Sequence, residues 1–162
     1  MIVQRLCIQE GTAAIITLEE DDPKLVEAML KHCYRQSYEE IRVDEQNGTG
    51  WGSSNISTFD AKLFCLADKY QCRSLALEIA THFERNWNYL SWAKVFEFLD
   101  IIYNLPAGSL VTIFQDMFRR TFVKQLSSCL QRSDFQELYQ RRSLLASDCL
   151  DILRKSYNMK AR

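Results

Sequence analysis

Apolar residues recur at helical spacing along most of this chain, and this pattern constrains its fold more than any other feature. In the first such segment the series is Leu25, Val26, Met29, Leu30, Cys33 and Tyr34. This spacing places apolar side chains on one face of a helix, which must then pack on a core. Asp22 can cap the helix, and Pro23 fits its first position because that position needs no N–H donor. The sequence therefore predicts a helix from Pro23 to Tyr34.

Two further apolar stripes follow a polar, glycine-rich stretch at residues 44–57. The first comprises Phe59, Leu63, Leu66, Ala67 and Tyr70, and the second comprises Leu75, Ala76, Ile79, Ala80, Phe83 and Trp87. Both predict helices, which open near Ser57 and Cys72, and their short connection predicts a helical hairpin. Asp68 and Lys69 fall between the apolar positions of the first stripe, so we expect both on its solvent side.

The last part of the chain, residues 89–162, continues the helical pattern. Its apolar series begin after four serines that can each cap a helix, namely Ser91, Ser109, Ser133 and Ser143. The series that follows Ser109 continues to Leu126. We expect these helices to stack antiparallel because their connections are short.

Only one segment has the character of a strand. Ile15-Ile16-Thr17-Leu18 is rich in β-branched residues and ends at the acidic cluster Glu19-Glu20-Asp21-Asp22. The predicted fold class is therefore mainly α, with a residual short β element and a helical C-terminal extension.

Composition limits the class of protein and its partners. The chain has 162 residues, of which 47% are hydrophobic and 25% are charged, and its formal net charge is −1. These values are typical of a globular protein. Neither nucleic acid nor a membrane is expected as a partner, because basic residues alternate with acidic ones in the C-terminal half and no apolar run approaches the roughly 18 residues of a membrane span.

Cysteine usage indicates the compartment. The six cysteines are Cys7, Cys33, Cys65, Cys72, Cys129 and Cys149. They contain no C-x-x-C pair, and the first ten residues lack the pattern of a signal peptide. We therefore expect buried thiols in a reducing compartment, the cytoplasm or the nucleus.

One motif carries a resemblance to a known family. Leu66-Ala67-Asp68-Lys69-Tyr70 follows Asp21-Asp22-Pro23 and the pair Tyr34 and Tyr38. In this order of motifs the chain resembles the second half of a BTB/POZ domain, most strongly that of fungal members. The resemblance implies a non-catalytic protein-protein interaction module that acts as an adaptor or scaffold.

The resemblance also implies boundaries and structural roles. It divides the chain into a partial BTB/POZ-like domain at residues 1–88 and a helical extension at residues 89–162. The signature positions, which would pack the central helix and its hairpin, are Leu30, Tyr34, Leu66, Ala67, Tyr70 and Leu75.

The first half of a BTB domain has no counterpart here. Met1 to Ala14 is too short for the strands and helix that normally supply most of the homodimer surface, although self-association by another route remains open. Ile15 to Leu18 would then form an exposed edge. The alternative is an incomplete version of a longer BTB protein, from a shortened gene or a misplaced start, with little independent function.

Two places are candidate partner contacts. Some BTB proteins are substrate adaptors for cullin ubiquitin ligases, a role associated with a hydrophobic-any-acidic triplet in the helix equivalent to the one predicted from Pro23. Leu25-Val26-Glu27 matches that triplet, so a cullin is a less favoured alternative to an unspecified protein partner. Trp51 lies in the polar loop, where a tryptophan either folds back on the body or meets a partner.

The sequence does not predict an enzyme, a metal or a cofactor. His32 and Cys33 are neighbours on a helix, where side chains point about 100° apart and cannot cooperate as base and nucleophile. The fold could bring together a zinc site drawn from His32, Cys33, Cys65, Cys72 and His82. However, Cys65 and Cys72 are too widely spaced for the cysteine pair of a structural zinc site. The glycine-rich stretch lacks the lysine and the spacing of a phosphate-binding loop.

Overall fold

The computed structural model describes residues 3–4, 15–16, 21–42, 56–106 and 110–160. These residues are mainly helical, which confirms the predicted mainly α fold class. The helices are α1 (Pro23–Cys33), a segment at 38–42, α3 (Ile56–Lys69), α4 (Arg73–Asn86), α5 (Trp92–Ile102), α6 (Val111–Thr121), α7 (Leu126–Leu130), α8 (Ser133–Arg141) and α9 (Ser143–Lys160), with 3₁₀ turns η1 (Trp87–Tyr89) and η2 (Phe122–Lys124).

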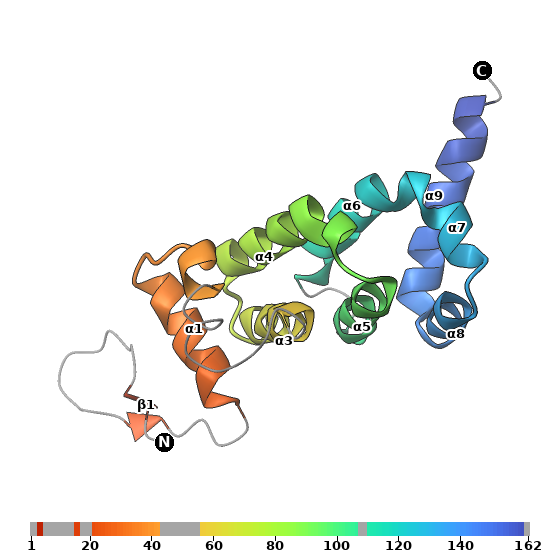
Figure 1. Cartoon of the computed structure of the whole chain (residues 1–162). Coiled ribbons are helices and arrows are strands. Elements are labelled where there is room, and N and C mark those ends of the chain that lie inside the picture. Colours follow the sequence, from red (N-terminus) through yellow and green to blue (C-terminus); the bar gives the residue numbers. More distant parts are fainter. Residues whose placement is uncertain (1–2, 5–14, 17–20, 43–55, 107–109, 161–162) are drawn as a thin grey trace.

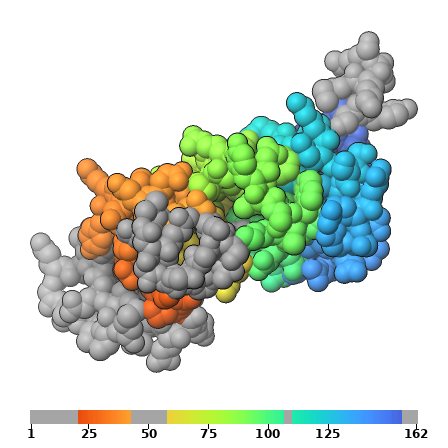
Figure 2. Space-filling view, in the orientation of Figure 1, coloured from red at the N-terminus to blue at the C-terminus, as the bar shows by residue number. Residues whose placement is uncertain are grey.

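The helices follow one another along an elongated molecule roughly in sequence order. α1 lies at one end, α3 to α6 occupy the middle, and α7, α8 and α9 form the other end (Figure 1). The space-filling view shows the same succession across one face (Figure 2). Among the helices of the described residues, none has both the length and the apolar character that crossing a membrane requires.

The predicted strand is present in part. Ile15–Ile16 forms β2 and pairs antiparallel with β1, Val3–Gln4, so that Val3 lies opposite Ile16. Thr17 and Leu18 lie outside the described residues. The sequence predicted an exposed edge at Ile15 to Leu18. This is wrong for one edge of β2, because that edge pairs with β1.

Helix α1 begins as predicted and ends one residue early. The Asp22 side chain accepts a hydrogen bond from the Lys24 N–H at 2.9 Å, and Pro23 occupies the first helical position. Leu30 packs against the core, but Tyr34 is 69% exposed. The expected core role of Tyr34 is therefore wrong, because Tyr34 follows the last turn and Arg35, with φ of 71°, reverses the chain.

Helices α3 and α4 form the predicted hairpin. The connection is tight because Gln71 adopts a left-handed conformation, with φ of 55°, and the Cys72 N–H donates to the Ala67 carbonyl at 2.8 Å. Leu66, Ala67 and Leu75 are buried, as core positions require. α3 also lies against α1 and α5, so the hairpin occupies the centre of the molecule.

One hydrophobic core runs through the described helices. Its buried members extend from Leu25 in α1 to Ile152 in α9, and they continue across the predicted boundary at residues 88 and 89. Phe114 in α6 is fully buried at the centre, where its ring lies against the rings of Phe83 and Phe98 at centroid distances of 5.4 and 5.2 Å.

The C-terminal helices begin near the predicted serines, with one difference. α5 begins after Ser91, while α8 and α9 begin at Ser133 and Ser143. The segment expected as one helix up to Leu126 instead divides into α6, η2 and α7. The expected cap at Ser109 lies outside the described residues.

Asp68 departs from its predicted place on the solvent side. It is buried, and its Oδ1 accepts a hydrogen bond from the backbone N–H of Leu110, the residue before α6. The first turn of a helix leaves N–H groups without partners, and a carboxylate is a favourable acceptor for them. The prediction was wrong because the hydrogen-bond donor, Leu110, is 42 residues away in the sequence, and helical periodicity around Asp68 does not reveal it.

A second buried carboxylate joins the C-terminal helices. Asp148 in α9 is 1% exposed, and its oxygens accept hydrogen bonds from the Tyr103 hydroxyl at 2.7 Å and from Arg119 Nε at 3.0 Å. A second Arg119 nitrogen donates to the same carboxylate at 2.6 Å. Arg119 belongs to α6 and Tyr103 follows α5, so this carboxylate connects three helices.

We expect Asp148→Ala to lower the free energy of unfolding by about 3 kcal/mol, since it leaves the partly buried Arg119 and the Tyr103 hydroxyl without their acceptor. Asp151→Ala is the matched control, because its pair with Arg154 at 3.9 Å is exposed and contributes about 0.5 kcal/mol or less. Urea unfolding followed by circular dichroism measures both. Equal losses in the two variants would contradict the buried role of Asp148.

Candidate functional site

The residues predicted to contact a partner through α1 are mostly in the core. Leu25 and Val26 are 8% and 2% exposed, so their side chains are not available to a partner. They face inward because α1 packs its apolar side on α3. Only Glu27 of the predicted triplet lies on the surface, where it pairs with Lys31 at 3.4 Å. Trp51, the other predicted contact, lies outside the described residues.

Tyr70 is a second correction. It was expected to be buried in the hairpin, but it is 38% exposed, and its hydroxyl donates to Asp21 Oδ2 at 2.6 Å. Lys69 Nζ donates to Asp21 Oδ1 at 2.9 Å. Both hydrogen bonds lower the pKa of Asp21, and the one from Tyr70 has the larger effect. Tyr70 therefore connects the end of α3 to the residues before α1 through its polar tip.

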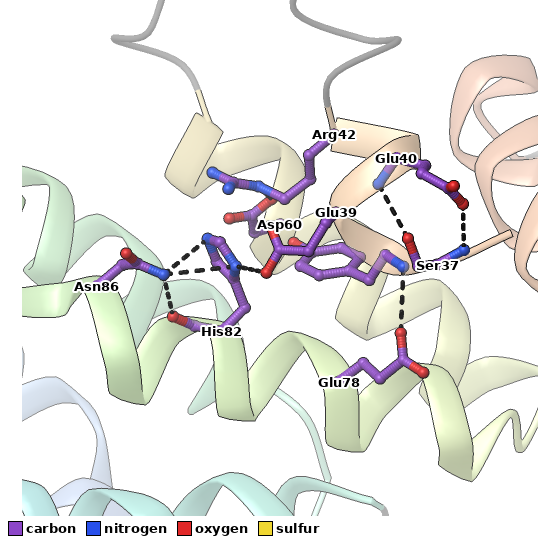
Figure 3. Close-up of polar contacts among 9 residues, drawn as sticks. Ser37, Glu39, Glu40, Arg42, Asp60, Glu78, His82 and Asn86 are labelled. Carbon is purple, nitrogen blue, oxygen red and sulfur yellow. Dashed lines mark hydrogen bonds and ion pairs between the residues drawn. The ribbon is translucent and has the colours of Figure 1, made fainter.

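A polar network surrounds the segment 38–42 and is the first place to look for chemistry (Figure 3). His82 Nδ1 lies 3.0 Å from Glu39 Oε1, and Asn86 Nδ2 donates to the His82 carbonyl at 2.9 Å. On the other side Arg42 Nε lies 3.3 Å from Asp60 Oδ1. Burial raises the pKa of Asp60, while the charge of Arg42 opposes that shift.

This network holds the segment 38–42 against α3 and α4. The Tyr38 N–H donates to Glu78 of α4 at 3.2 Å, and the Tyr38 ring meets the His82 ring edge-on at 5.4 Å. Within the described residues, the His82 ring has hydrogen-bond contacts with Glu39 and Asn86. The described part of the chain also holds no group of three or more His, Cys, Asp or Glu side chains that could bind a metal ion.

The prediction of uniformly buried thiols is corrected in part. Cys129 and Cys149 are buried, Cys65 and Cys72 are half-buried, and Cys33 is exposed. Burial raises the pKa of Cys65 and Cys129 to about 11 and that of Cys149 to about 12, which disfavours their thiolate forms at neutral pH. Cys33 is exposed because it is the last residue of α1, at the end of the helix. Cys7 lies outside the described residues.

An aromatic pocket lies where η1, α5 and the start of α7 meet. Its volume is about 130 Å³, and it is lined by Trp87, Asn88, Leu90, Trp92, Val95 and Gln125. The two tryptophans are five residues apart in the sequence, but their spacing alone does not predict a pocket. The missing information was Gln125, which approaches from a different part of the chain.

The core fixes the walls of this pocket. The Trp87 ring is buried and lies against the Phe122 ring at 4.9 Å and the Trp92 ring at 6.0 Å. The Leu90 N–H donates to the Trp87 carbonyl at 3.1 Å, which closes the turn between η1 and α5. The position of both indole rings is therefore set before any ligand arrives.

A polar group lines the pocket, and two exposed apolar residues lie close to its lining residues in the sequence. The Gln125 Oε1 atom is buried and has no hydrogen-bond partner among the described residues. Tyr89, between two lining residues, is 87% exposed, and Val123, two residues before Gln125, is 37% exposed. Two of the six lining residues are tryptophans, a residue type that is enriched in protein interfaces.

Comparisons with known proteins add no identity to this geometry: no family model matches the chain, and neither curated proteins nor solved structures give a match.

We expect Tyr70→Phe to lower the free energy of unfolding by about 1 kcal/mol at pH 7, because it removes the hydrogen bond to Asp21. The pKa of Asp21 is lower in the folded chain, so the stabilisation is present above its unfolded value of 3.8 and is lost as the pH falls below it. The difference from the parent chain should therefore shrink below about pH 4.

Tyr34→Phe is the matched control for this measurement, since Tyr34 is the more exposed tyrosine and its change should leave stability unaltered. Unfolding curves at several pH values compare the three proteins. A Tyr70→Phe effect that stays constant down to pH 2.5 would contradict the assigned role of Asp21.

Proposed function

We propose that this chain is a non-catalytic protein-protein interaction module that acts as an adaptor or scaffold. The observation that carries the proposal is the pocket lined by Trp87 and Trp92, with the exposed Tyr89 next to its lining residues in the sequence. Tryptophan and tyrosine dominate the energetics of protein interfaces because they bury large areas at a low cost in side-chain entropy.

The size of the pocket favours one anchoring side chain as its occupant. Pockets for cofactors and drug-sized molecules have volumes of about 300–1,000 Å³, whereas a cavity of about 150 Å³ accommodates a benzene ring. A pocket of about 130 Å³ therefore matches a single apolar or aromatic side chain of a partner. Rotation of the Gln125 amide about its last torsion would let Oε1 accept a hydrogen bond from that partner.

The BTB/POZ type remains our proposal for the class of this module. It is supported by the sequence motif of residues 66–70 and by the buried positions of Leu66, Ala67 and Leu75 in the central hairpin. We propose the cytoplasm or the nucleus as the compartment, because the cysteine pattern of the sequence is typical of a reducing environment. Burial of Leu25 and Val26 does not favour a cullin contact through α1, so the partner is proposed to be another protein.

The proposal is tested by a charge placed beside the pocket. We expect Tyr89→Asp to weaken binding of an affinity-captured and then purified partner by about tenfold or more, since it removes an exposed aromatic contact and adds a charge to be desolvated. Isothermal titration with the parent chain and the variant measures the change. Tyr89 is 87% exposed, so the variant should retain the parent stability.

Tyr34→Asp is the matched control, because Tyr34 is also an exposed tyrosine but lies at the end of α1. It should leave the affinity unchanged. Loss of binding in Tyr34→Asp with full binding in Tyr89→Asp would place the interface elsewhere, and turnover of a small-molecule substrate by the chain would contradict a non-catalytic module.

A further inference from the structure

We propose that the aromatic pocket binds a tyrosine side chain of the partner, whose hydroxyl donates a hydrogen bond to Gln125. The inference rests on the proposed interaction module and names the side chain that its pocket receives. Four observations select tyrosine, namely the volume of the pocket, the inclination of its two indole rings, the neutral character of its described lining residues and the unpaired acceptor of Gln125.

The volume of the pocket limits its occupant to one ring. The pocket has a volume of about 130 Å³, and a cavity of about 150 Å³ accommodates benzene. The side chains of tyrosine and phenylalanine each carry one six-membered ring, whereas tryptophan carries a second, fused ring. Volume therefore favours tyrosine and phenylalanine over tryptophan.

The two indole walls favour an aromatic occupant. The ring centroids of Trp87 and Trp92 are 6.0 Å apart, and the ring planes are inclined at 55° to each other. Trp87 is buried against Phe122, so the core fixes the inclination of its ring. Aromatic rings prefer offset-stacked or edge-on contacts, and two walls inclined in this way offer both kinds to one incoming ring.

The lining of the pocket disfavours a charged occupant. None of the six described residues that line it carries a charge, and its polar side chains are the amides of Asn88 and Gln125. Indole faces attract a cation, but a lysine or arginine that entered would lose its water without meeting a carboxylate in this lining. A neutral side chain enters without this loss of charge solvation.

The unpaired acceptor of Gln125 distinguishes tyrosine from phenylalanine. Gln125 Oε1 is buried and has no hydrogen-bond partner among the described residues. Buried polar atoms are nearly always paired in folded proteins, so this acceptor in a pocket wall favours an occupant with a donor. Tyrosine has a hydroxyl donor at the end of its ring, and rotation of the Gln125 amide about its last torsion lets Oε1 accept from it. Histidine also has an N–H donor, but its second ring nitrogen would lie unpaired against apolar walls.

The experiment titrates the full chain with N-acetylated amino-acid amides as probes, at pH 7.5. The probes are the amides of tyrosine, phenylalanine, tryptophan, histidine and lysine. Nuclear magnetic resonance follows the indole N–H signals of Trp87 and Trp92, which report binding at the pocket itself. We expect the tyrosine probe to bind about fivefold more tightly than the phenylalanine probe, because it adds one hydrogen bond in a site shielded from water.

Gln125→Leu removes the acceptor while it keeps a side chain of similar size. It should lower the affinity for the tyrosine probe about fivefold, to that of the phenylalanine probe, and leave the affinity for the phenylalanine probe unchanged. Gln140→Leu is the matched control, since Gln140 is an exposed glutamine of α8 that does not line the pocket, and it should change neither affinity. Circular dichroism checks that both variants keep their helices, and the ratio of the two affinities in the parent chain tests the inference without any variant.

Equal affinities of the parent chain for the tyrosine and phenylalanine probes would overturn the inference. So would tighter binding of the tryptophan, histidine or lysine probe, no binding of any probe, or a tyrosine preference that survives in a folded Gln125→Leu. These outcomes leave the proposed interaction module standing, because the titration of the purified partner with Tyr89→Asp tests that module separately.

Discussion

Aromatic packing around Phe114 is the interaction on which the rest of the structure depends. Its ring lies against those of Phe64 in α3, Phe83 in α4 and Phe98 in α5, at centroid distances of 6.3, 5.4 and 5.2 Å. Such ring pairs stabilise a core beyond the burial of their area, because offset and edge-on contacts align the ring quadrupoles. The four helices therefore share one set of contacts, and a large-to-small change at Phe114 would affect all of them together. The division at residues 88 and 89 remains a prediction about folding units, but the packing itself crosses it.

The same aromatic packing extends to the candidate site. Phe118 stacks on Phe122 at 4.3 Å, Phe122 lies 4.9 Å from Trp87, and Trp87 lies 6.0 Å from Trp92. The pocket thus takes its shape from side chains that are already held by the core. A binding site that is ordered in advance loses less entropy when a partner arrives, which favours affinity from a small contact area. This continuity between core and pocket is the physical basis for the proposed interaction module.

The sequence predicted local structure well because helical periodicity and caps are local properties. The start of α1 at Pro23 follows from the capping residue Asp22, and the α3–α4 hairpin follows from the spacing of apolar residues. α8 and α9 begin at the predicted serines, but Ser133 does not cap α8, whose N-cap is Arg132. The failures involve partners far away in the sequence. Asp68 is buried because Leu110 needs an acceptor, Tyr70 reaches Asp21, and Tyr34 leaves the core because the chain reverses after it. The pocket was missed for the same reason, since Gln125 joins residues 87–95 only in the folded chain.

Hydrogen-deuterium exchange of the full chain, alone and bound to its purified partner, tests the central claim most directly. The account predicts that binding slows exchange at residues 87–95 and 121–125, which include all the residues that line the pocket. Exchange along α1 should stay unchanged, since α1 lies at the other end of the molecule from α7 (Figure 1). Protection confined to α1 or α9, with none at the pocket, would contradict the account and place the interface on another face.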